Sequence, residues 1–170
     1  FYDYLINDYG EEFARKYLEA NEKAIINIQK IIKEEQIDCD FEIKSAYVFA
    51  QKEDEVLEIE KEVRAVNKIG KRAEFVSEIK DFPLKIKGAI KFENQAQYHP
   101  RKYMLGLCKS ILTKNKIYEN TTAIEVERSG NNYIIHTDKG DIETEKIVIA
   151  THYPILNMPG FYFTKMYQST

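Results

Sequence analysis

The sequence predicts a mixed α+β (α/β) fold, and three patterns in its 170 residues indicate it. Residues 11–35 and 53–69 place apolar side chains every three or four positions, which is typical of amphipathic helices. Between residues 124 and 145 apolar and polar residues alternate around two turns, which predicts a three-stranded antiparallel meander. The run Ile147 to Ala150 is apolar at every position, which favours a strand covered on both faces within a mostly parallel sheet.

The composition indicates a soluble globular protein, with 44% hydrophobic and 31% charged residues. The formal net charge of −3 argues against a nucleic-acid or anionic-membrane partner, because both require a basic face. No apolar run approaches the roughly 20 residues that span a bilayer, so we expect a cytoplasmic protein without a membrane span. Cys39 and Cys108 lie far apart and lack neighbours at metal-ligand spacing, which predicts reduced thiols and no metal site.

The first half of the chain is predicted to alternate helices and strands. A long helix over 11–35 is followed by a strand over Ser45–Gln51. A second helix over 53–69 has a glutamate- and lysine-rich face that we interpret as solvated surface, and Gly70 is well suited to end it. Residues 74–79 are strand-like.

The second half begins with a predicted strand over Gly88–Gln95, separated from the preceding strand by Pro83, which blocks continued pairing. Pro100 suits the first turn of a third helix, since its missing N–H would have no partner there. After that helix, Lys116–Glu119 is a short candidate for a parallel strand. The third helix is expected to bury a stripe of apolar residues: Tyr103, Met104, Leu107, Cys108, Ile111 and Leu112.

A polar run follows the strand that begins at Gly88. It places the side chains of Gln95, Gln97 and His99 between the end of a strand and the start of a helix. Several hydrogen-bonding groups at one sheet end are a common way to orient a small molecule, so these three residues are candidates for a substrate pocket. An ordinary polar loop explains the same composition.

The residues after Ala150 occupy a second position of interest. Ligands of open parallel sheets gather beyond the carboxyl ends of the strands, and Thr151 and His152 lie there if Ile147–Ala150 is such a strand. The alternative is a core strand that leads into an ordinary loop. The glycines never fall as G-x-G-x-x-G, and neither H-E-x-x-H, C-x-x-C nor G-x-S-x-G is present, so the sequence identifies no diphosphate site and no catalytic residue.

Taken together, three segments resemble FAD-dependent oxidoreductases of the D-amino-acid oxidase, glycine oxidase and sarcosine oxidase type. Residues 88–103 resemble the family's strand, short loop, "x-x-Asp-Pro" and helix, with His99 in place of the aspartate. Residues 116–126 are similar to its "G-x-x-I-x-x-x-T-x-V-x-x-I" segment. The meander followed by 147–152 resembles the closing strand that usually reads V-V-x-A-[TA]-G, with His152 in place of the glycine.

The resemblance implies a Rossmann-like FAD domain with a three-stranded meander, interleaved with an antiparallel substrate domain. Residues 1–40 would be a helical segment of the FAD domain, and 41–99 part of the substrate domain. Residues 100–160 would return to the FAD domain, and 161–170 would begin a return to the substrate domain. The family's glycine-rich first turn and its substrate-binding arginine have no counterpart here, so we expect an interior piece of a larger protein.

The resemblance also implies a cofactor and its contacts. The parent protein would bind FAD, with the backbone of Ala123 against the adenine and with Ala150, Thr151 and His152 along the flavin nucleotide. It would move a hydride from an amino acid or related amine to the flavin, while the 170 residues alone would be inactive. Two other classes stay open: a non-catalytic α+β module that binds a ligand or partner, and a flavoenzyme similar to glycerol-3-phosphate dehydrogenase. The sequence leaves the substrate, the electron acceptor and the oligomeric state open.

Overall fold

The computed structural model describes residues 1–152, and the chain divides into two compact units, Phe1–Ile117 and Tyr118–Thr170. Each unit contains an antiparallel sheet of its own, as predicted for a mixed fold. Within the described residues, no helix is both long and apolar enough to cross a membrane.

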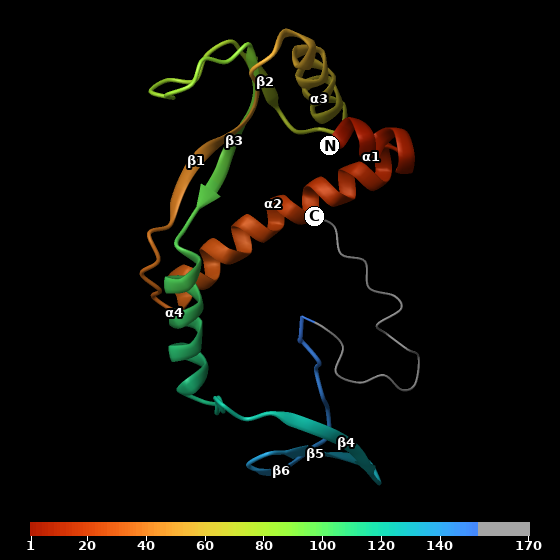
Figure 1. The fold of residues 1–170 in the computed structure, drawn as a ribbon, viewed down its shortest axis with the longest axis vertical. Helices are drawn as coiled ribbons and strands as arrows, with labels where there is room; N and C mark the ends of the chain where they lie inside the picture. Colours follow the sequence, from red (N-terminus) through yellow and green to blue (C-terminus); the bar gives the residue numbers. More distant parts are fainter. Residues whose placement is uncertain (153–170) are drawn as a thin grey trace. The chain divides into compact units, whose positions relative to one another are not determined.

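The first unit is built on a three-stranded sheet in the order β1–β3–β2 (Figure 1). Its strands are β1 (Glu42–Ala50), β2 (Ala73–Val76) and β3 (Gly88–Gln97), and both edge strands run antiparallel to β3. A short 3₁₀ turn, Glu53–Glu55, leads into α3 (Val56–Lys68), which packs against all three strands. These elements match the sequence prediction closely, except that β1 begins three residues earlier than the predicted Ser45, β2 is shorter than predicted and β3 is longer.

The core of this unit lies between α3 and the sheet. Ile90 on β3 and Val66 on α3 are completely buried, and Ile59, Ala50 and Ala73 complete the cluster. Full burial of an isoleucine or valine side chain contributes about 1.5–3 kcal/mol. Because the apolar positions of α3 recur at helical spacing, one face of the helix covers the sheet and the opposite face carries its charged residues.

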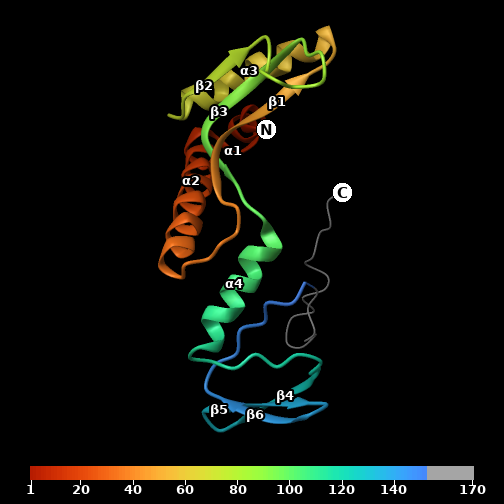
Figure 2. The ribbon, with the colours of Figure 1, turned by 90° about the vertical axis from the view of Figure 1, so that its left-hand side faces the viewer.

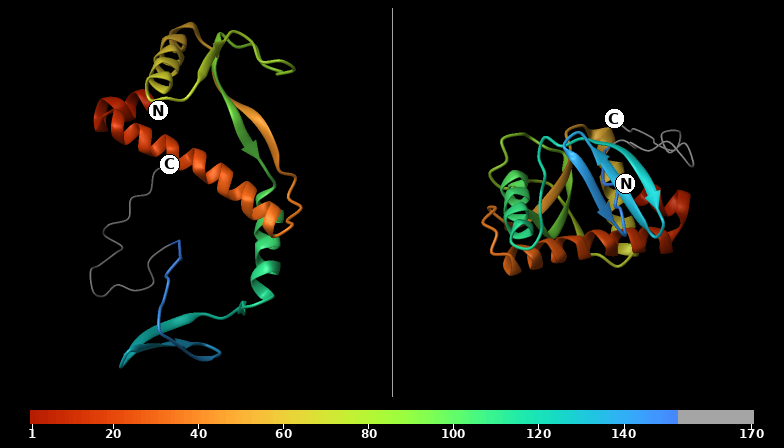
Figure 3. Two further views of the ribbon diagram at one scale, coloured as in Figure 1. Left: turned by 180° about the vertical axis from the view of Figure 1, so that it is seen from behind. Right: turned by 90° about the horizontal axis from the view of Figure 1, so that it is seen from below.

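Three further helices belong to the first unit: α1 (Tyr2–Tyr9), α2 (Glu11–Glu34) and α4 (Pro100–Leu112). From α1, the long α2 extends to α4 at its far end (Figure 3, left). Helix α1 was not predicted from the sequence. Gly10 separates α1 from α2 with φ = 86°, a left-handed conformation that glycine adopts without a steric penalty.

The carboxylate of Glu62 fixes the start of α1. This α3 side chain accepts hydrogen bonds from the backbone N–H groups of Tyr2 (2.7 Å) and Asp3 (3.0 Å). The first N–H groups of a helix have no partners within the helix, and a negative charge there is favourable. Burial by itself would raise the pKa of Glu62, but the hydrogen bonds from the backbone N–H groups of Asp3 and Tyr2 help to lower it overall. Glu62 therefore ties α1 to α3.

The second unit contains the predicted meander. Strands β4 (Ala123–Ser129), β5 (Asn132–Thr137) and β6 (Gly140–Thr144) pair antiparallel in chain order (Figure 2). Gly130 adopts φ = 61° in the first turn, where a residue with a side chain would be strained. The alternating pattern of the sequence therefore identified this sheet correctly.

Two predicted strands are not formed. Residues 147–150 lie outside any strand, and Val148 is 89% exposed, so the prediction of a strand buried on both faces is wrong for the described chain. The physical reason is that no strand among residues 1–152 lies beside this run to supply ladder hydrogen bonds. Lys116–Glu119 is likewise not a strand. Residues 161–170, which were expected to begin a return to the substrate domain, lie outside the described residues.

The predicted buried stripe of α4 is only partly buried. Tyr103 packs into a cluster with Ile37 and Cys39, as expected for a stripe residue. In contrast, Met104 and Leu112 are more than half exposed within the described chain. Helical spacing identifies which residues share a face, but burial also requires a neighbouring element. Cys39 is buried and Cys108 half-buried, and both are free thiols.

Candidate functional site

A bulge in β3 directs the side chain of Gln95. Lys44 pairs with Gln95 while Ala46 pairs with Phe92, so β3 contains one more residue than β1 between these pairs. Asn94 lies within this bulge and has φ = 56°, a conformation that asparagine tolerates better than most residues. In a regular strand, residues three positions apart such as Phe92 and Gln95 would point to opposite faces of the sheet, and the bulge changes this. With it they share one face, and bulges often redirect side chains in this way near functional sites.

The end of α3 fixes the position of Lys71. Gly70 has φ = 99°, and the backbone N–H of Lys71 donates to the carbonyl oxygen of Val66 (3.3 Å), as in a Schellman motif. The side-chain amide of Asn67 then both donates to and accepts from the backbone of Ala73, at 3.0 and 3.1 Å. The short connection from α3 to β2 is therefore held at both ends, and the Lys71 side chain is only 13% exposed.

Glu22 approaches the same point from α2. It follows Ala14 and Leu18 at intervals of four residues, so it lies on the helix face that buries those two side chains. The Glu22 carboxylate forms an ion pair with Lys71, and its Oε1 atom also accepts a hydrogen bond from Gln95 Nε2 (3.3 Å). Side chains from the α3–β2 connection and from β3 thus converge on one carboxylate of α2.

These three polar residues line a cavity of about 270 Å³ whose remaining walls are largely aromatic. The Lys71 ammonium lies 5.8 Å from the centroid of the Phe92 ring, within the range of a cation–π interaction. Burial raises the pKa of the Tyr2 phenol, and the nearby Tyr17, Glu22 and Glu62 raise it further, so this phenol is neutral at physiological pH. The cavity therefore combines a paired charge with neutral aromatic walls.

The other two predicted pocket residues lie outside this cavity. Gln97 is exposed, and its Nε2 donates to the Glu42 carboxylate on the paired strand (2.9 Å). His99 caps the N-terminus of α4, where its ring Nδ1 accepts a hydrogen bond from the backbone N–H of Lys102 (3.5 Å). Of the three candidates, Gln95 is therefore the one that lines this cavity.

The predicted cofactor-binding residues belong to the second unit. Ala123 begins β4 and is exposed, and the residue before it is held firmly in place. The Thr122 N–H donates to Asp138 Oδ1 (2.9 Å), and the Asp138 N–H donates to the Thr122 carbonyl oxygen (3.1 Å). Ala150, Thr151 and His152 follow the meander in an exposed, non-strand conformation.

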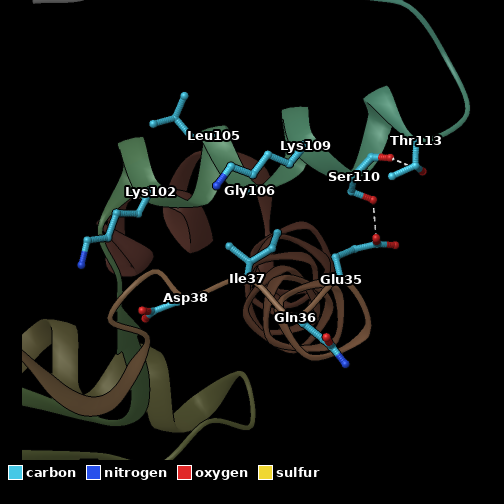
Figure 4. Close-up of a pocket in the computed structure, with 10 residues that line it drawn as sticks. All are labelled: Glu35, Gln36, Ile37, Asp38, Lys102, Leu105, Gly106, Lys109, Ser110 and Thr113. Atoms are coloured by element: carbon cyan, nitrogen blue, oxygen red, sulfur yellow. Dashed lines mark hydrogen bonds between the residues drawn. The ribbon is translucent and has the colours of Figure 1, made fainter.

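A larger cavity of about 660 Å³ lies between the end of α2 and α4 (Figure 4). Its lining includes Glu35, whose carboxylate accepts a hydrogen bond from the Ser110 hydroxyl, and Lys102, which forms an ion pair with Asp40 (2.8 Å). These charged side chains are exposed, so water weakens their interaction with any ligand. The cavity at Gln95 is the stronger candidate because its ion pair is partly buried.

Glu22 and Lys71 were not predicted from the sequence. A signal for Glu22 was available, since a carboxylate four residues after the buried Leu18 lies on the buried face of its helix. For Lys71 the signal was only its position just after Gly70, which does not reveal a partner on α2. Among the described residues, no group of three or more histidine, cysteine or acidic side chains is arranged to hold a metal ion.

Comparison with known proteins defines the family to which this chain belongs. Residues 2–165 match the model of the DAO family, described as FAD dependent oxidoreductase. Because this match extends over most of the chain, the protein belongs to that family. The relationship suggested by the three sequence segments is therefore confirmed.

One curated relative aligns with nearly the whole chain. The chain is 33% identical over 167 residues to a protein of Bacillus subtilis (strain 168) named "Putative Rieske 2Fe-2S iron-sulfur protein YhfW". The match covers 98% of this chain and 33% of the relative, so the chain spans about a third of the length of that protein.

Solved structures share the fold at low sequence identity. Glycine oxidase from Geobacillus kaustophilus matches with a TM-score of 0.65 and 15% identity, over 79% of this chain and 38% of that one. L-amino acid deaminase from Proteus vulgaris matches with a TM-score of 0.61 and 16% identity, over 82% of this chain and 34% of that one. L-proline dehydrogenase from P. horikoshii matches with a TM-score of 0.57 and 18% identity, over 73% of this chain and 35% of that one. These similarities confirm the predicted fold class.

Proposed function

We propose that the parent protein is an FAD-dependent oxidoreductase that moves a hydride from the amine-bearing carbon of an amino acid or related amine to the flavin. The observation that carries this proposal is the match of residues 2–165 to the FAD dependent oxidoreductase family. The fold shared with a glycine oxidase and an L-amino acid deaminase supports an amino-acid substrate. A small-molecule substrate and a cytoplasmic location accompany this proposal.

Within that protein, the chain supplies parts of two domains. Residues 1–40 and 100–160 belong to the FAD domain, 41–99 belong to the substrate domain, and 161–170 begin a return to it. Gln95, Gln97 and His99 remain the substrate-pocket candidates of this proposal. Of these, Gln95 has the strongest support because it lines a partly buried cavity.

The second unit would contact the cofactor through Ala123 and through residues 150–152. FAD would accept the hydride at its flavin ring. The small, exposed side chain of Ala123 leaves its backbone accessible, and the paired hydrogen bonds of Thr122 and Asp138 fix that backbone as an adenine contact requires. Ala150, Thr151 and His152 are exposed and can approach a nucleotide. The 170 residues would supply only some of the contacts to FAD, because they contain no glycine-rich motif to bind its pyrophosphate.

FAD titration tests this division of the cofactor site. We expect the full-length protein to retain FAD through purification, and the 170-residue chain to bind added FAD weakly or not at all. The measurement is the quenching of flavin fluorescence during titration, with FMN as a control ligand that lacks the adenine. Tight FAD binding by the 170-residue chain would contradict the proposed division, and a full-length protein without affinity for FAD would contradict the proposed function.

A second candidate function follows from the curated relative. Since a protein with Rieske in its name aligns with 98% of this chain, we propose that the parent passes electrons from its flavin to a [2Fe–2S] cluster. Its ligands would belong to other parts of the polypeptide, because the described residues offer no metal-binding group. Iron and acid-labile sulfide analysis of the full-length protein, with electron paramagnetic resonance after reduction, tests this candidate.

The two alternatives considered from sequence have distinct outcomes in the same experiments. A flavoenzyme similar to glycerol-3-phosphate dehydrogenase would hold FAD but would be reduced by a hydroxyl-bearing phosphate ester and not by amino acids. A non-catalytic binding module would be colourless. The family match disfavours the second alternative.

A further inference from the structure

Asp138 holds Thr122 through two contacts with its backbone. The Oδ1 atom of Asp138 accepts a hydrogen bond from the Thr122 N–H group (2.9 Å), and the Asp138 N–H group donates to the Thr122 carbonyl oxygen (3.1 Å). Asp138 lies in the turn that joins β5 to β6, and Thr122 directly precedes β4. Both backbone groups of Thr122 are therefore directed toward the neighbouring strand and its turn.

This arrangement turns the backbone of Ala123 the other way. Ala123 lies opposite Thr137 of β5, and the bond from the Asp138 N–H group to the Thr122 carbonyl oxygen identifies them as a non-hydrogen-bonded pair. In such a pair the N–H and C=O groups of each residue point away from the partner strand. The sheet order β4–β5–β6 leaves no strand on that side of β4 among residues 1–152. A donor and an acceptor of Ala123 thus lie side by side at an open edge.

The direction of Ala123 depends on Asp138 because the ladder is interrupted directly after Ala123. The register between β4 and β5 shifts between Ala123 and Glu125, so Ile124 is an extra residue in β4. Such a bulge disrupts the regular pairing of the strand at that point. The rest of β4 therefore fixes Ala123 less firmly than a regular strand would, and the contacts of Asp138 hold the residue on its other side.

Asp138 itself is held in place by the turn around it. The Thr137 hydroxyl donates a hydrogen bond to the Gly140 carbonyl oxygen (2.5 Å) and accepts one from the Lys139 N–H group (3.1 Å). These bonds fix the residues on both sides of Asp138. Backbone groups that are already in position lower the entropic cost of binding a ligand.

We propose that Asp138 is a positioning residue of the FAD site, which holds the N–H and C=O groups of Ala123 toward the adenine of the cofactor. This inference rests on the proposed function, and it assigns Asp138 no contact of its own with FAD. Adenine carries an amino donor beside a ring-nitrogen acceptor, so the C=O and N–H groups of one residue can pair with it at both points. Without the Asp138 contacts Thr122 would be free to turn, and Ala123 would lose this direction. Asp138 therefore sets the affinity of the protein for a cofactor that contains adenine.

The test is titration of FAD into the full-length protein after removal of its flavin, followed by flavin fluorescence. Asp138→Ala removes the oxygen that accepts the Thr122 N–H group and should weaken FAD binding at least about tenfold. Loss of a negative charge would by itself favour the anionic FAD, so a weaker affinity is opposite to the general electrostatic effect. Asp138→Asn keeps a side-chain oxygen that can accept the same bond and should recover most of the lost affinity. FMN, which lacks the adenine, should bind to the wild type and to Asp138→Ala equally.

Asp141→Ala provides a matched control. Asp141 lies on β6 of the same sheet and its carboxylate contacts the ring of His136 (2.9 Å), so the variant removes the same charge and leaves the contacts of Thr122 intact. It should bind FAD at least as tightly as the wild type, and circular dichroism should show that all three variants are folded. Equal FAD affinity for the wild type and Asp138→Ala would overturn the proposal, as would equal losses in Asp138→Ala and Asp141→Ala or a parallel loss of FMN affinity. In the wild type alone, FAD should slow hydrogen exchange in a peptide that contains Ala123, and unchanged exchange would also overturn the proposal.

The failure of this inference can be told apart from the failure of the proposed function. A wild-type protein that binds FAD tightly, with the same affinity in Asp138→Ala, would overturn the role of Asp138 and leave the oxidoreductase function intact. A full-length wild-type protein without affinity for FAD would contradict the proposed function and this inference together.

Discussion

Replacing Gly106 by alanine should destabilise α4, although alanine is normally the better helix residue. A Cβ atom at Gly106 would lie 2.4 Å from Cγ2 of Ile37 and 2.9 Å from its Cγ1. Carbon atoms in contact are normally about 3.5–4.0 Å apart. Ile37 belongs to the buried cluster with Cys39 and Tyr103, and the atoms nearest the new methyl group are close to its backbone, where they move least.

The expected magnitude combines two opposing effects. Alanine in place of glycine within a helix stabilises by about 1 kcal/mol. Overpacking in a well-packed core costs about 1–3 kcal/mol. Because Ile37 cannot yield without moving its backbone, we expect a cost near the upper limit and a net loss of about 2 kcal/mol in the local stability of α4.

Hydrogen exchange measured by mass spectrometry on peptides from α4 gives that local stability in the full-length protein. The matched background is Ile37→Ala, which removes both of the closest carbon atoms. In that background only the Cβ of residue 37 remains close to the new methyl group, at 3.1 Å, so Gly106→Ala should no longer destabilise α4 and should stabilise it by up to about 1 kcal/mol. A stabilising effect of Gly106→Ala in the presence of Ile37 would refute the close approach of the helix to this side chain.

Three further predictions concern individual residues. Glu62→Gln should lower the local free energy of unfolding of α1 by about 1–2 kcal/mol, measured by hydrogen exchange at neutral pH. Because the pKa of Glu62 is lowered in the folded protein, its stabilising contribution is present above about pH 4.3 and is lost as the pH falls further. Asp141 and Glu127 raise the pKa of His136, so the protonated ring stabilises the meander fully below about pH 6.5, and this stabilisation is lost as the pH rises through the folded-state pKa. In thermal melts at several pH values, His136→Asn should remove this pH dependence of stability. Asn94→Gly should leave the bulge intact while Asn94→Val destabilises it by about 1–3 kcal/mol, measured by exchange of β3 amides.

Most of the secondary structure could be predicted because it depends on local periodicity. The helix over residues 11–35 and the meander after residue 123 each show a repeat that matches one backbone geometry. The run Ile147–Ala150 shows the limit of this reasoning. An apolar, β-branched run shows that burial would be favourable, but a strand forms only beside another strand, and none lies beside it among the described residues.

The candidate site was less predictable because it depends on contacts between distant residues. Glu22 and Lys71 are 49 positions apart, and neither has an unusual local sequence. The direction of Gln95 depends on the extra residue in β3, which becomes visible only when the register with β1 is known. Gln97 and His99 looked equally suitable, but the pairing of their side chains with Glu42 and with the backbone of α4 uses them locally.

Anaerobic mixing of the purified full-length protein with a panel of amino acids, followed in the visible spectrum, tests the central claim most directly. The account predicts a yellow protein whose flavin absorption bands disappear when a suitable amino acid or related amine is added and return when an electron acceptor is admitted. A colourless protein, or a flavin that no amino acid or amine reduces, would contradict it.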